Sequence, residues 1–352
     1  MRKAYLVLAD GTIYEGLGFG AEICKTGTLV FNTSVVGYIE TLTDPRYAGQ
    51  IVLQTFPLIG NYGMIEEDLL GEPFLHGYVV REWCETPSNF RSQYDLDEYL
   101  KNKGIPGIYG LDTRAITRKI RECGEMNAMI CSKLPDSLNE IKAFRMENAV
   151  QMCTCTEAQV YPAQGDAAKR VALLDFGAHQ GMVEELTKRN CEVTLLPAAT
   201  SAEEIISGRF DGLMLSAGPG DPNENAACIE QVAELLGKLP IFGVGLGHQI
   251  LALAAGGKVQ KMNHGHRGGN QPVKDVKGSR TYITSQNHSY VVLEDTVPGG
   301  EMIYMNANDG SCEGMDYPGK QAFSVQFMPE AVCIPQDTSF LYDRFISMMG
   351  GE

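Results

Sequence analysis

The chain has 352 residues, of which 44% are hydrophobic and 21% charged, a composition typical of a soluble globular protein with about two domains. Its 29 lysines and arginines against 44 aspartates and glutamates give a formal net charge of −15. Such an acidic chain is a poor candidate for binding the phosphate backbone of a nucleic acid. Disordered and fibrous classes are excluded, whereas small-molecule and protein partners stay open.

The ten cysteines are scattered along the chain, whereas a disulfide framework is normally dense and confined to small secreted domains. We therefore expect reduced, mostly buried thiols in a cytoplasmic protein. Only Cys153 and Cys155 lie close together, which is weak evidence for a metal, and no metal site is expected. The N-terminal apolar run ends at Asp10, too early for a signal peptide. The longest apolar stretch, 241–257, is interrupted and shorter than a membrane span, so no membrane contact is expected.

Residues 1–133 mix short strands and turns. Apolar runs predict strands at 4–9, 29–31 and 50–54. A helix is predicted over 112–122, where Ile116 and Ile120 are four residues apart and basic residues occupy the other faces. This part of the chain is interpreted as an N-terminal α+β domain. Residues 134–169 are rich in polar residues and contain prolines, and they are interpreted as a partly helical connector that ends in a loop.

From residue 170 to 352 strands and helices alternate. Strands are predicted at 171–174, 193–196, 212–215 and 241–244, and helices at 180–189, 228–236 and 248–255. Ser201 and Glu204 have the spacing of a capping box, which opens another helix. This alternation predicts an open, mostly parallel sheet of the α/β class. Because sites in such sheets lie at the carboxyl ends of strands, the loops 216–222 and 245–247 are the expected site.

The second of these loops has the frame of a nucleophile elbow, Gly243-Val244-Gly245-Leu246-Gly247. In an elbow the middle residue sits on a strained turn between strand and helix, and flanking glycines avoid clashes with neighbouring side chains. That middle residue is normally Ser or Cys, but here it is Gly245. A dinucleotide-binding interpretation fails, because the pattern would need glycine at His248.

Three motifs in the right order resemble the class I glutamine amidotransferase family. Residues 240–249 resemble its elbow, with Gly245 in place of Cys; 216–222 resemble its oxyanion loop; and 325–331 resemble its His-Pro-Glu strand end, with Met328 in place of His. Within that family the chain resembles the small subunits of carbamoyl-phosphate synthetase along nearly its whole length. The N-terminal segments that carry this resemblance are 31–34, 37–38, 42–45, 60–63 and 112–114, and the C-terminal ones are 265–270 and 285–288.

The resemblance implies a mechanism and a set of roles. A Cys thiolate attacks the glutamine amide, a His oriented by a Glu moves the proton, and ammonia passes to a large subunit that uses ATP and bicarbonate. Glu330 occupies the position of the orienting Glu. Backbone N–H groups of Leu246 and of Gly218 or Gly220 would hold the oxyanion. The glutamine-contact positions are occupied by Gln249, Asn287, Ser289 and Tyr290. The resemblance implies no cofactor in this subunit.

Departures from the family pattern decide between the functions it allows. Gly245 offers no nucleophile and Met328 offers no transferable proton, so Gly245 is interpreted as a turn residue and Met328 as an apolar space filler. His248 and His288 are interpreted as structural polar partners rather than replacement bases. Arg46 stands where the family has Ser, and it is expected with Asp44 either at the domain junction or on the surface.

Three functional hypotheses remain. The first is a glutaminase-deficient small subunit of carbamoyl-phosphate synthetase, in pyrimidine and arginine precursor synthesis, that serves an ammonia-using large subunit. The second is an active glutamine-hydrolysing subunit, which requires an unrecognised nucleophile. The third is a regulatory or ligand-binding protein without chemistry, which retains a pocket for a ligand such as glutamine.

Overall fold

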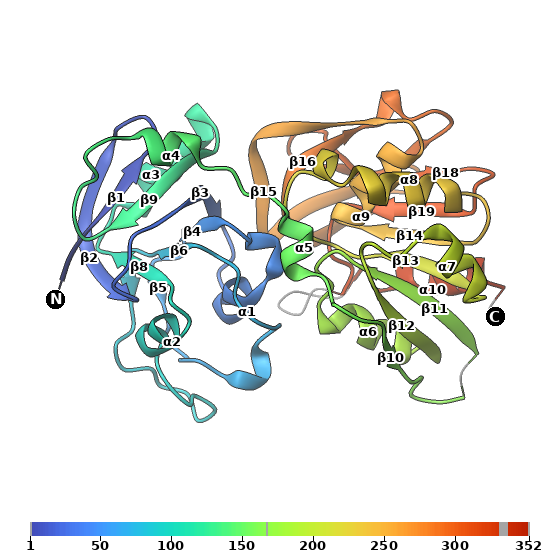
Figure 1. Cartoon of the computed structure of the whole chain (residues 1–352), viewed down its shortest axis with the longest axis horizontal. Coiled ribbons are helices and arrows are strands. Elements are labelled where there is room, and N and C mark those ends of the chain that lie inside the picture. The colour runs from blue at the N-terminus through green and yellow to red at the C-terminus, as the bar shows by residue number, and fades with distance from the viewer. Residues whose placement is uncertain (1, 167, 331–336, 351–352) are drawn as a thin grey trace. The chain divides into compact units, whose positions relative to one another are not determined.

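The computed structural model describes residues 2–166, 168–330 and 337–350, and it divides the chain into two compact units. The first unit comprises residues up to 147 together with Asn263–Arg267, and the second comprises Asn148–Met262 and the residues from Gly268 onward. The chain therefore enters the first unit twice, the second time with only five residues. Figure 1 traces the elements of each unit.

The first unit is built on a closed β-barrel. Its strands follow the order β1-β2-β8-β6-β4-β3-β9, and β9 pairs back onto β1. The barrel strands are β1 (Arg2–Leu8), β2 (Ile13–Gly20), β3 (Lys25–Asn32), β4 (Gln50–Gln54), β6 (Gly77–Val79), β8 (Pro106–Tyr109) and β9 (Met126–Cys131). A separate pair is formed by β5 (Leu58–Ile59) and β7 (Glu82–Trp83), and the helices are α1 (Tyr38–Thr43), α2 (Leu96–Asn102), α3 (Thr113–Cys123), α4 (Asn139–Ala143), η1 (Pro45–Tyr47) and η2 (Glu66–Asp68).

Alternation along the barrel strands separates two layers of core. Leu6 and Leu8 join an apolar cluster that draws on six strands and on α3, while Val7 between them packs with Ile141 of α4. A further cluster packs α1 and α2 against the barrel. Trp83, the single tryptophan of the chain, stacks on Phe19 with ring centroids 5.5 Å apart.

The second unit contains a ten-stranded sheet with a parallel centre. Its order is β10-β12-β11-β13-β14-β19-β18-β17-β15-β16, and the five strands from β12 to β19 are parallel. These are β10 (Gln159–Tyr161), β11 (Lys169–Asp175), β12 (Cys191–Pro197), β13 (Gly212–Leu215), β14 (Ile241–Val244), β15 (Lys258–Asp275), β16 (Thr281–Leu293), β17 (Glu301–Asn306), β18 (Cys312–Tyr317) and β19 (Ala322–Val325). The helices are α5 (Ala149–Cys153), α6 (Gln180–Thr187), α7 (Ala202–Ser207), α8 (Ala226–Leu235), α9 (Leu246–Ala254), α10 (Phe340–Met348), η3 (Pro222–Glu224) and η4 (Glu294–Thr296).

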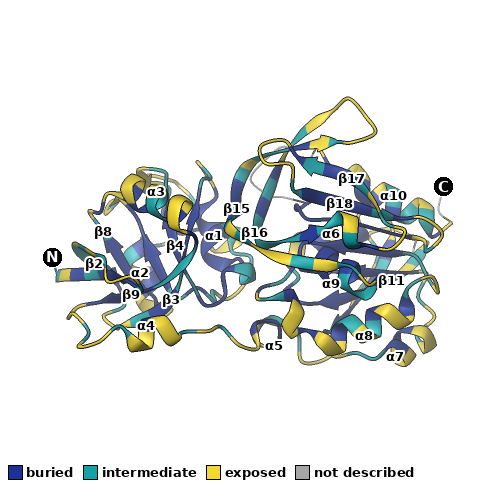
Figure 2. Cartoon of the chain, turned by 90° about the horizontal axis from the view of Figure 1, so that it is seen from above, coloured by how far each residue is buried: buried dark blue, intermediate teal, exposed yellow. Residues whose placement is uncertain are grey.

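Helices cover both faces of this sheet, and its central strands are buried throughout (Figure 2). One apolar cluster joins α7, α8 and α9 to one face, and another joins α6 and α10 to the other. Burial on both faces explains why β13 and β14 are continuous apolar runs rather than alternating ones. The expected α/β fold with an open, mostly parallel sheet is confirmed, and antiparallel strands extend both of its edges.

Most predicted elements are found close to their predicted bounds. The predicted strands at 50–54, 212–215 and 241–244 coincide with β4, β13 and β14. Ser201 and Glu204 form the predicted capping box at the start of α7. Within 134–169 the structure has α4 in the first unit, and α5 and the unpredicted strand β10 in the second. The strand β10, which pairs antiparallel with β12, was not predicted, whereas the described residues between β10 and β11 form no helix or strand, as predicted for a terminal loop.

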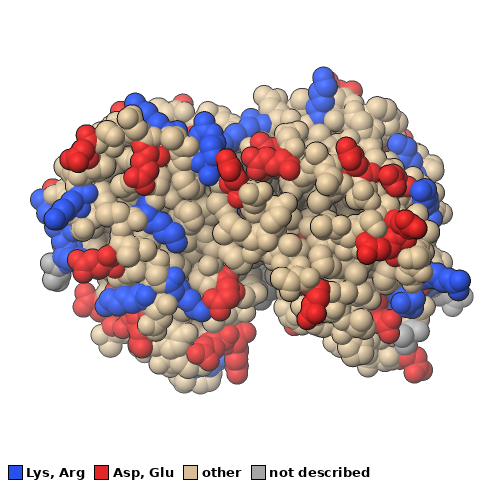
Figure 3. All heavy atoms as spheres, viewed as in Figure 1, with Lys and Arg blue, Asp and Glu red and all other residues tan. Residues whose placement is uncertain are grey.

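The distribution of surface charge and the lengths of the helices show how the chain can meet water or a membrane. Acidic and basic side chains are interspersed on the face of each unit shown in Figure 3. Among the described residues, each helix is too short or too polar to cross a membrane.

Candidate functional site at the carboxyl edge of the sheet

Loops that follow four parallel strands of the second unit carry the candidate site. His179 follows β11, residues 216–220 follow β13, Gly245 follows β14, and Glu330 follows β19. Because the strands are parallel, their carboxyl ends lie at one edge of the sheet, where α/β proteins bind their ligands.

Gly245 keeps the backbone of an elbow although it has no side chain. Its φ of 58° and ψ of −111° are a combination that residues with a Cβ rarely adopt. Its N–H donates to the carbonyl of Val325 at 2.9 Å, which fixes the turn against β19. A Cβ at this position would lie 3.0 Å from the Cβ of Ala217. The strained strand-to-helix turn is therefore present without a group that could attack a substrate.

The flanking glycines are required by close backbone packing. A Cβ on Gly243 would lie 2.7 Å from the carbonyl oxygen of Gly247, and one on Gly247 would lie 2.4 Å from the carbonyl oxygen of Leu215. Both distances are shorter than side chains tolerate. This confirms the expectation that side chains at these two positions would clash.

The structure places the two candidate oxyanion glycines differently. A Cβ on Gly218 would lie 2.9 Å from the side chain of Leu246, so Gly218 lies beside the start of α9, where helix N–H groups lack intrahelical acceptors. Gly220 is exposed and lies against Ala149 of α5. Of the two, Gly218 is the one that the fold brings next to Leu246.

Met328 lies in an apolar environment. It is 5% exposed and belongs to the core cluster that also contains Ala217 and Phe327. Its N–H donates to the carbonyl of Ser285 at 3.0 Å. A thioether is at most a weak hydrogen-bond acceptor and cannot transfer a proton, so this position fills space between strands.

Glu330 was expected to orient a base at position 328, on the same strand end. In the structure its carboxylate lies beside His179. The carboxylate is buried, its Oε2 accepts from the Tyr342 hydroxyl at 2.8 Å, and its Oε1 lies 3.0 Å from Nε2 of His179. This last pair is at ion-pair distance but is not aligned as a hydrogen bond. Burial and the negative charge of Glu330 raise the pKa of Tyr342 well above its ordinary value. Sequence reasoning missed His179 and Tyr342, because neither belongs to a motif.

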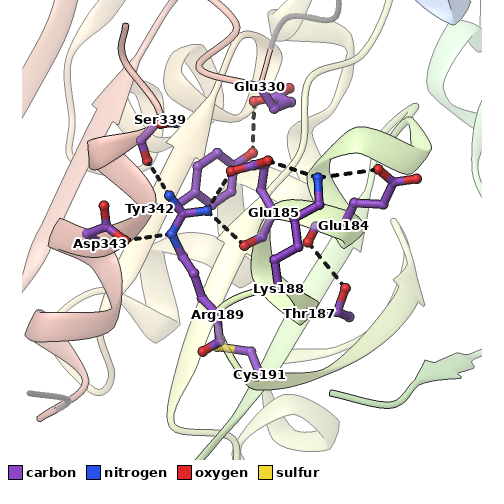
Figure 4. Close-up of polar contacts among 10 residues, drawn as sticks. All are labelled: Glu184, Glu185, Thr187, Lys188, Arg189, Cys191, Glu330, Ser339, Tyr342 and Asp343. Carbon is purple, nitrogen blue, oxygen red and sulfur yellow. Dashed lines mark hydrogen bonds and ion pairs between the residues drawn. The ribbon is translucent and has the colours of Figure 1, made fainter. Parts of the chain in front are cut away.

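A polar network behind Glu330 holds Tyr342 in place (Figure 4). The Arg189 guanidinium donates to Asp343 at 2.6 Å and to the carbonyl of Ser339 at 3.1 Å, and its centre lies 5.5 Å from the centroid of the Tyr342 ring. Arg189 also pairs with Glu185, four residues before it. The network thus links α6 to α10 and positions the Tyr342 hydroxyl that donates a hydrogen bond to Glu330.

The amide of Gln249 is already hydrogen-bonded within the second unit. Its Nε2 donates to Oε1 of Gln326 at 2.8 Å and to the carbonyl of Tyr290 at 3.0 Å, which uses both of its hydrogens. The Tyr290 hydroxyl donates to Oδ2 of Asp221 at 2.8 Å. Tyr290 therefore joins β16 to the loop after β13, a connection that no motif indicated.

Asn287 and Ser289 are half-buried on β16, and strand alternation places them on one face. The opposite face is lined by Thr284, Gln286 and His288, which are buried. These three are linked by contacts of 3.1 Å from Gln286 to Thr284 and 3.2 Å between His288 and Gln286. Asn287 and Ser289 therefore lie on the face of β16 opposite to the buried polar side chains.

The two histidines of the motifs have structural contacts. Nδ1 of His248 lies 2.7 Å from the Ser324 hydroxyl, and complete burial lowers its pKa to about 3. Nδ1 of His288 lies 2.8 Å from the carbonyl of Tyr290. A histidine that stays neutral and shielded from solvent is unsuited to proton transfer, which agrees with the interpretation of His248 as a structural partner.

Arg46 and Asp44 form an ion pair in the first unit. Nε and Nη2 of Arg46 donate to Oδ1 and Oδ2 of Asp44 at 2.8 and 2.7 Å, and the two side chains are 11% and 7% exposed. Asp44 is buried and Arg46 half-buried, so neither side chain is freely exposed, and a position at the domain junction stays a prediction. Their bidentate pairing explains how a bulky cation is accommodated there.

No disulfide joins the nine described cysteines. Four are buried, three half-buried and two exposed, so the expectation of mostly buried thiols is only partly met. Burial raises the pKa of Cys131 and Cys191 to about 11, and burial together with Asp175 raises the pKa of Cys155 to about 11. Such thiols stay protonated at neutral pH and are poor nucleophiles. Cys333 lies outside the described residues.

Comparisons with known proteins agree with this geometry. Residues 172–348 match the family "Glutamine amidotransferase class-I", and residues 6–130 match "Carbamoyl-phosphate synthase small chain, CPSase domain". The chain is 44% identical to carbamoyl phosphate synthase small chains of Oceanobacillus iheyensis and Bacillus caldolyticus, each over 99% of this chain and 96% of the relative. It is 45% identical to that of Fusobacterium nucleatum, over 98% of both.

The elbow, the oxyanion loop and the parallel sheet place the second unit in the class I glutamine amidotransferases. Full-length similarity is more specific, because it includes the barrel unit as well. The chain belongs to the carbamoyl-phosphate synthase small chain family.

Proposed function

We propose that this chain is a glutaminase-deficient small subunit of carbamoyl-phosphate synthase. It binds a large subunit that makes carbamoyl phosphate from free ammonia, and it works in the cytoplasm in pyrimidine and arginine precursor synthesis, with no cofactor of its own. Small-chain relatives at 44% identity support the partner. A family-like fold without the family's nucleophile supports the loss of glutamine hydrolysis.

One observation carries the proposal: Gly245 occupies the elbow with its strained backbone intact and no side chain. The base position is also lost, because Met328 is buried among apolar residues. Loss of one member of a nucleophile–base unit costs on the order of 10⁴–10⁶ in rate, and such losses are not additive. The remaining Glu330 has His179 and Tyr342 as its partners.

An active glutaminase would need another thiol or hydroxyl at the site. The pKa of the Cys155 thiol is raised to about 11 by burial and by Asp175, and Cys131 lies in the barrel unit. These properties argue against a substitute thiolate. A regulatory or ligand-binding protein is the remaining alternative, and it differs from the proposal in not requiring the large chain.

A glutaminase assay tests the catalytic half of the proposal. Purified protein, alone and with the large chain, is incubated with glutamine and ammonia release is measured, with an enzyme of established glutaminase activity as positive control. We expect release at the buffer level. Release above this level that a thiol-alkylating reagent abolishes would show an active glutaminase.

Reconstitution tests the assembly half. The two chains are co-expressed and analysed by size-exclusion chromatography, and carbamoyl phosphate formation is measured with ammonium or glutamine as nitrogen source. We expect co-elution and synthesis from ammonium only. Separate elution at micromolar concentrations would favour the regulatory alternative.

A further inference from the structure

Phe90 of the first unit exposes its side chain to an unusual degree. It is 97% exposed, and the next most exposed large apolar side chains among the described residues are Val35 and Val160, both at 63%. Isolated exposed apolar residues are common on protein surfaces. An almost fully exposed aromatic ring suggests a function only if the backbone fixes it in that exposed position.

The backbone does hold it, because Phe90 lies in a hydrogen-bonded turn. Ser92 N–H donates to the carbonyl of Asn89 at 3.1 Å, which closes a β-turn with Phe90 at its second position. Oδ1 of Asn89 also accepts from Arg91 N–H at 2.8 Å, as asparagine does at the start of many turns. The conformation that presents the ring is therefore specified locally.

Hydrogen bonds on both sides brace this turn against residues 61–64. Before Phe90, Ser88 N–H donates to the carbonyl of Asn61 at 3.1 Å. After it, Gln93 N–H donates to the carbonyl of Met64 at 3.0 Å, and Met64 N–H donates to Tyr94 at 2.9 Å. A loop bonded at both ends loses little conformational freedom when a partner binds, so its binding cost is low.

The neighbouring charges are mainly acidic. Arg91 donates to Asp68 at 2.7 Å and to Glu67 at 3.1 Å. Both acidic residues belong to η2, which also contains Glu66, so two carboxylates contact the guanidinium and a third acidic residue belongs to the same short helix. A protein surface that accepts the ring should consequently be apolar at its centre and basic around its rim.

We propose that Phe90 is an anchor residue with which this chain docks on the carbamoyl-phosphate synthase large chain. The inference rests on the function proposed above, because family membership supplies the partner. Aromatic side chains that fill a partner pocket contribute most of the binding energy in many interfaces. A braced turn that presents a bare aromatic ring with acidic neighbours has the form of such an anchor.

The test compares the affinity of full-length variants for the large chain by biolayer interferometry. Phe90→Ala should raise the Kd by about 10- to 100-fold, while Phe90→Trp should stay within about threefold because it keeps a large ring. Val160→Ala is the control, since Val160 is an exposed apolar residue of the second unit. Thermal melts should be the same for all variants, because the Phe90 side chain is solvent-exposed.

The outcomes separate this inference from the proposed function. If the wild-type chain does not bind the large chain, the proposed function fails. If it binds and Phe90→Ala binds equally well, or Val160→Ala loses as much affinity, only the anchor is refuted. Self-association that Phe90→Ala abolishes, seen by light scattering without the large chain, would instead assign the ring to a contact between copies and overturn the proposal.

Discussion

Substitution of two residues, Gly245 and Met328, could restore the nucleophile and the base that attack on glutamine requires. The double variant Gly245→Cys/Met328→His supplies a thiol and a base on a site that keeps Gly218, Leu246 and Glu330. We expect it to form a covalent adduct with a glutamine-mimicking electrophile, detected by mass spectrometry, whereas neither single variant does. A thiol without a base stays mostly protonated, near its ordinary pKa of about 8.5.

Recovery should be partial. Glu330 already contacts His179 and Tyr342, so a new imidazole at 328 competes for its carboxylate, and misplacement by ~1 Å can cost ~100-fold. Addition of His179→Ala to the double variant should then raise the labelling rate. Equal labelling of Gly245→Cys alone and of the double variant would show that another group acts as base.

A Cys at 245 should also be costly to the fold. The φ of 58° disfavours any residue with a Cβ, and that Cβ would lie 3.0 Å from Ala217. We expect Gly245→Cys to lower the free energy of unfolding by ~1–3 kcal/mol, and Ala217→Gly to restore part of this. Hydrogen exchange of α9 measures the change. Unaltered protection would mean that the turn stores no strain.

Burial of His248 predicts a pH dependence. Its pKa is lowered to about 3 in the folded state, so the unfolded state, with a pKa of about 6.5, binds the proton more readily. Stability is therefore complete above the unfolded pKa and is lost as the pH falls toward the folded one. Between pH 7 and 5 this loss amounts to about 2 kcal/mol.

The variant His248→Asn removes the titrating group and should flatten that pH dependence by the same amount. Hydrogen exchange of α9 at pH 7 and 5 gives the comparison, because other acid-sensitive groups contribute equally to both proteins. An identical pH dependence in the variant would contradict the buried, neutral state of His248.

At the scale of elements, the short stretch 263–267 of β15 completes the first unit. Arg267 Nη1 donates to Oε1 of Glu125 at 2.6 Å, and the two side chains are 3% and 2% exposed. Thr33 on the loop after β3 donates its N–H and its hydroxyl to the carbonyl of Arg267. This segment therefore brings both a charge and a backbone acceptor to the first unit.

We expect Arg267→Met to destabilise the first unit by about 3–5 kcal/mol, because the carboxylate of Glu125 loses its buried ion-pair partner. Fluorescence of Trp83, the single tryptophan, reports the unfolding of this unit. The double variant Glu125→Gln/Arg267→Met should recover much of the loss, since it buries no unpaired charge. A single variant as stable as the parent would contradict this account.

Local signals predicted some elements and were silent on others. β13 and β14 are apolar runs followed by glycine-containing turns, and the capping box of α7 is specified within four residues. The long strand β15 mixes glycines with polar residues and the middle of β16 is polar, so neither strand shows a regular alternation of apolar and polar residues. Barrel closure depends on pairs distant in sequence, such as Tyr5 with Cys131, and no local pattern predicts it.

The same distinction applies to the site. Gly245, Leu246 and Glu330 could be located from motifs, because the spacing of an elbow and a strand end is local. His179 directly precedes α6 and Tyr342 lies on α10, and only the packing of these helices on one face of the sheet brings the two side chains to Glu330. The Tyr290–Asp221 hydrogen bond likewise joins residues 69 positions apart.

At the scale of the whole molecule, the two units share one interleaved chain. Unit boundaries at 147 and at 263–267 mean that a fragment ending at residue 147 lacks part of its own unit. We expect such a fragment to unfold at a lower denaturant concentration than the intact chain when Trp83 fluorescence is followed, by an amount comparable to the Arg267→Met effect. A fragment as stable as the intact chain would show that the short segment is dispensable.

The return of residues 263–267 to the first unit also sets an order of events during protein synthesis. A ribosome that adds 5–20 residues per second needs about 6–23 s to make the intervening residues 148–262. Throughout this interval the nascent first unit has all of its barrel strands but lacks Arg267, so Glu125 stays hydrated and the unit is incomplete. The first unit is thus completed only after residues 148–262 of the second unit have been synthesised.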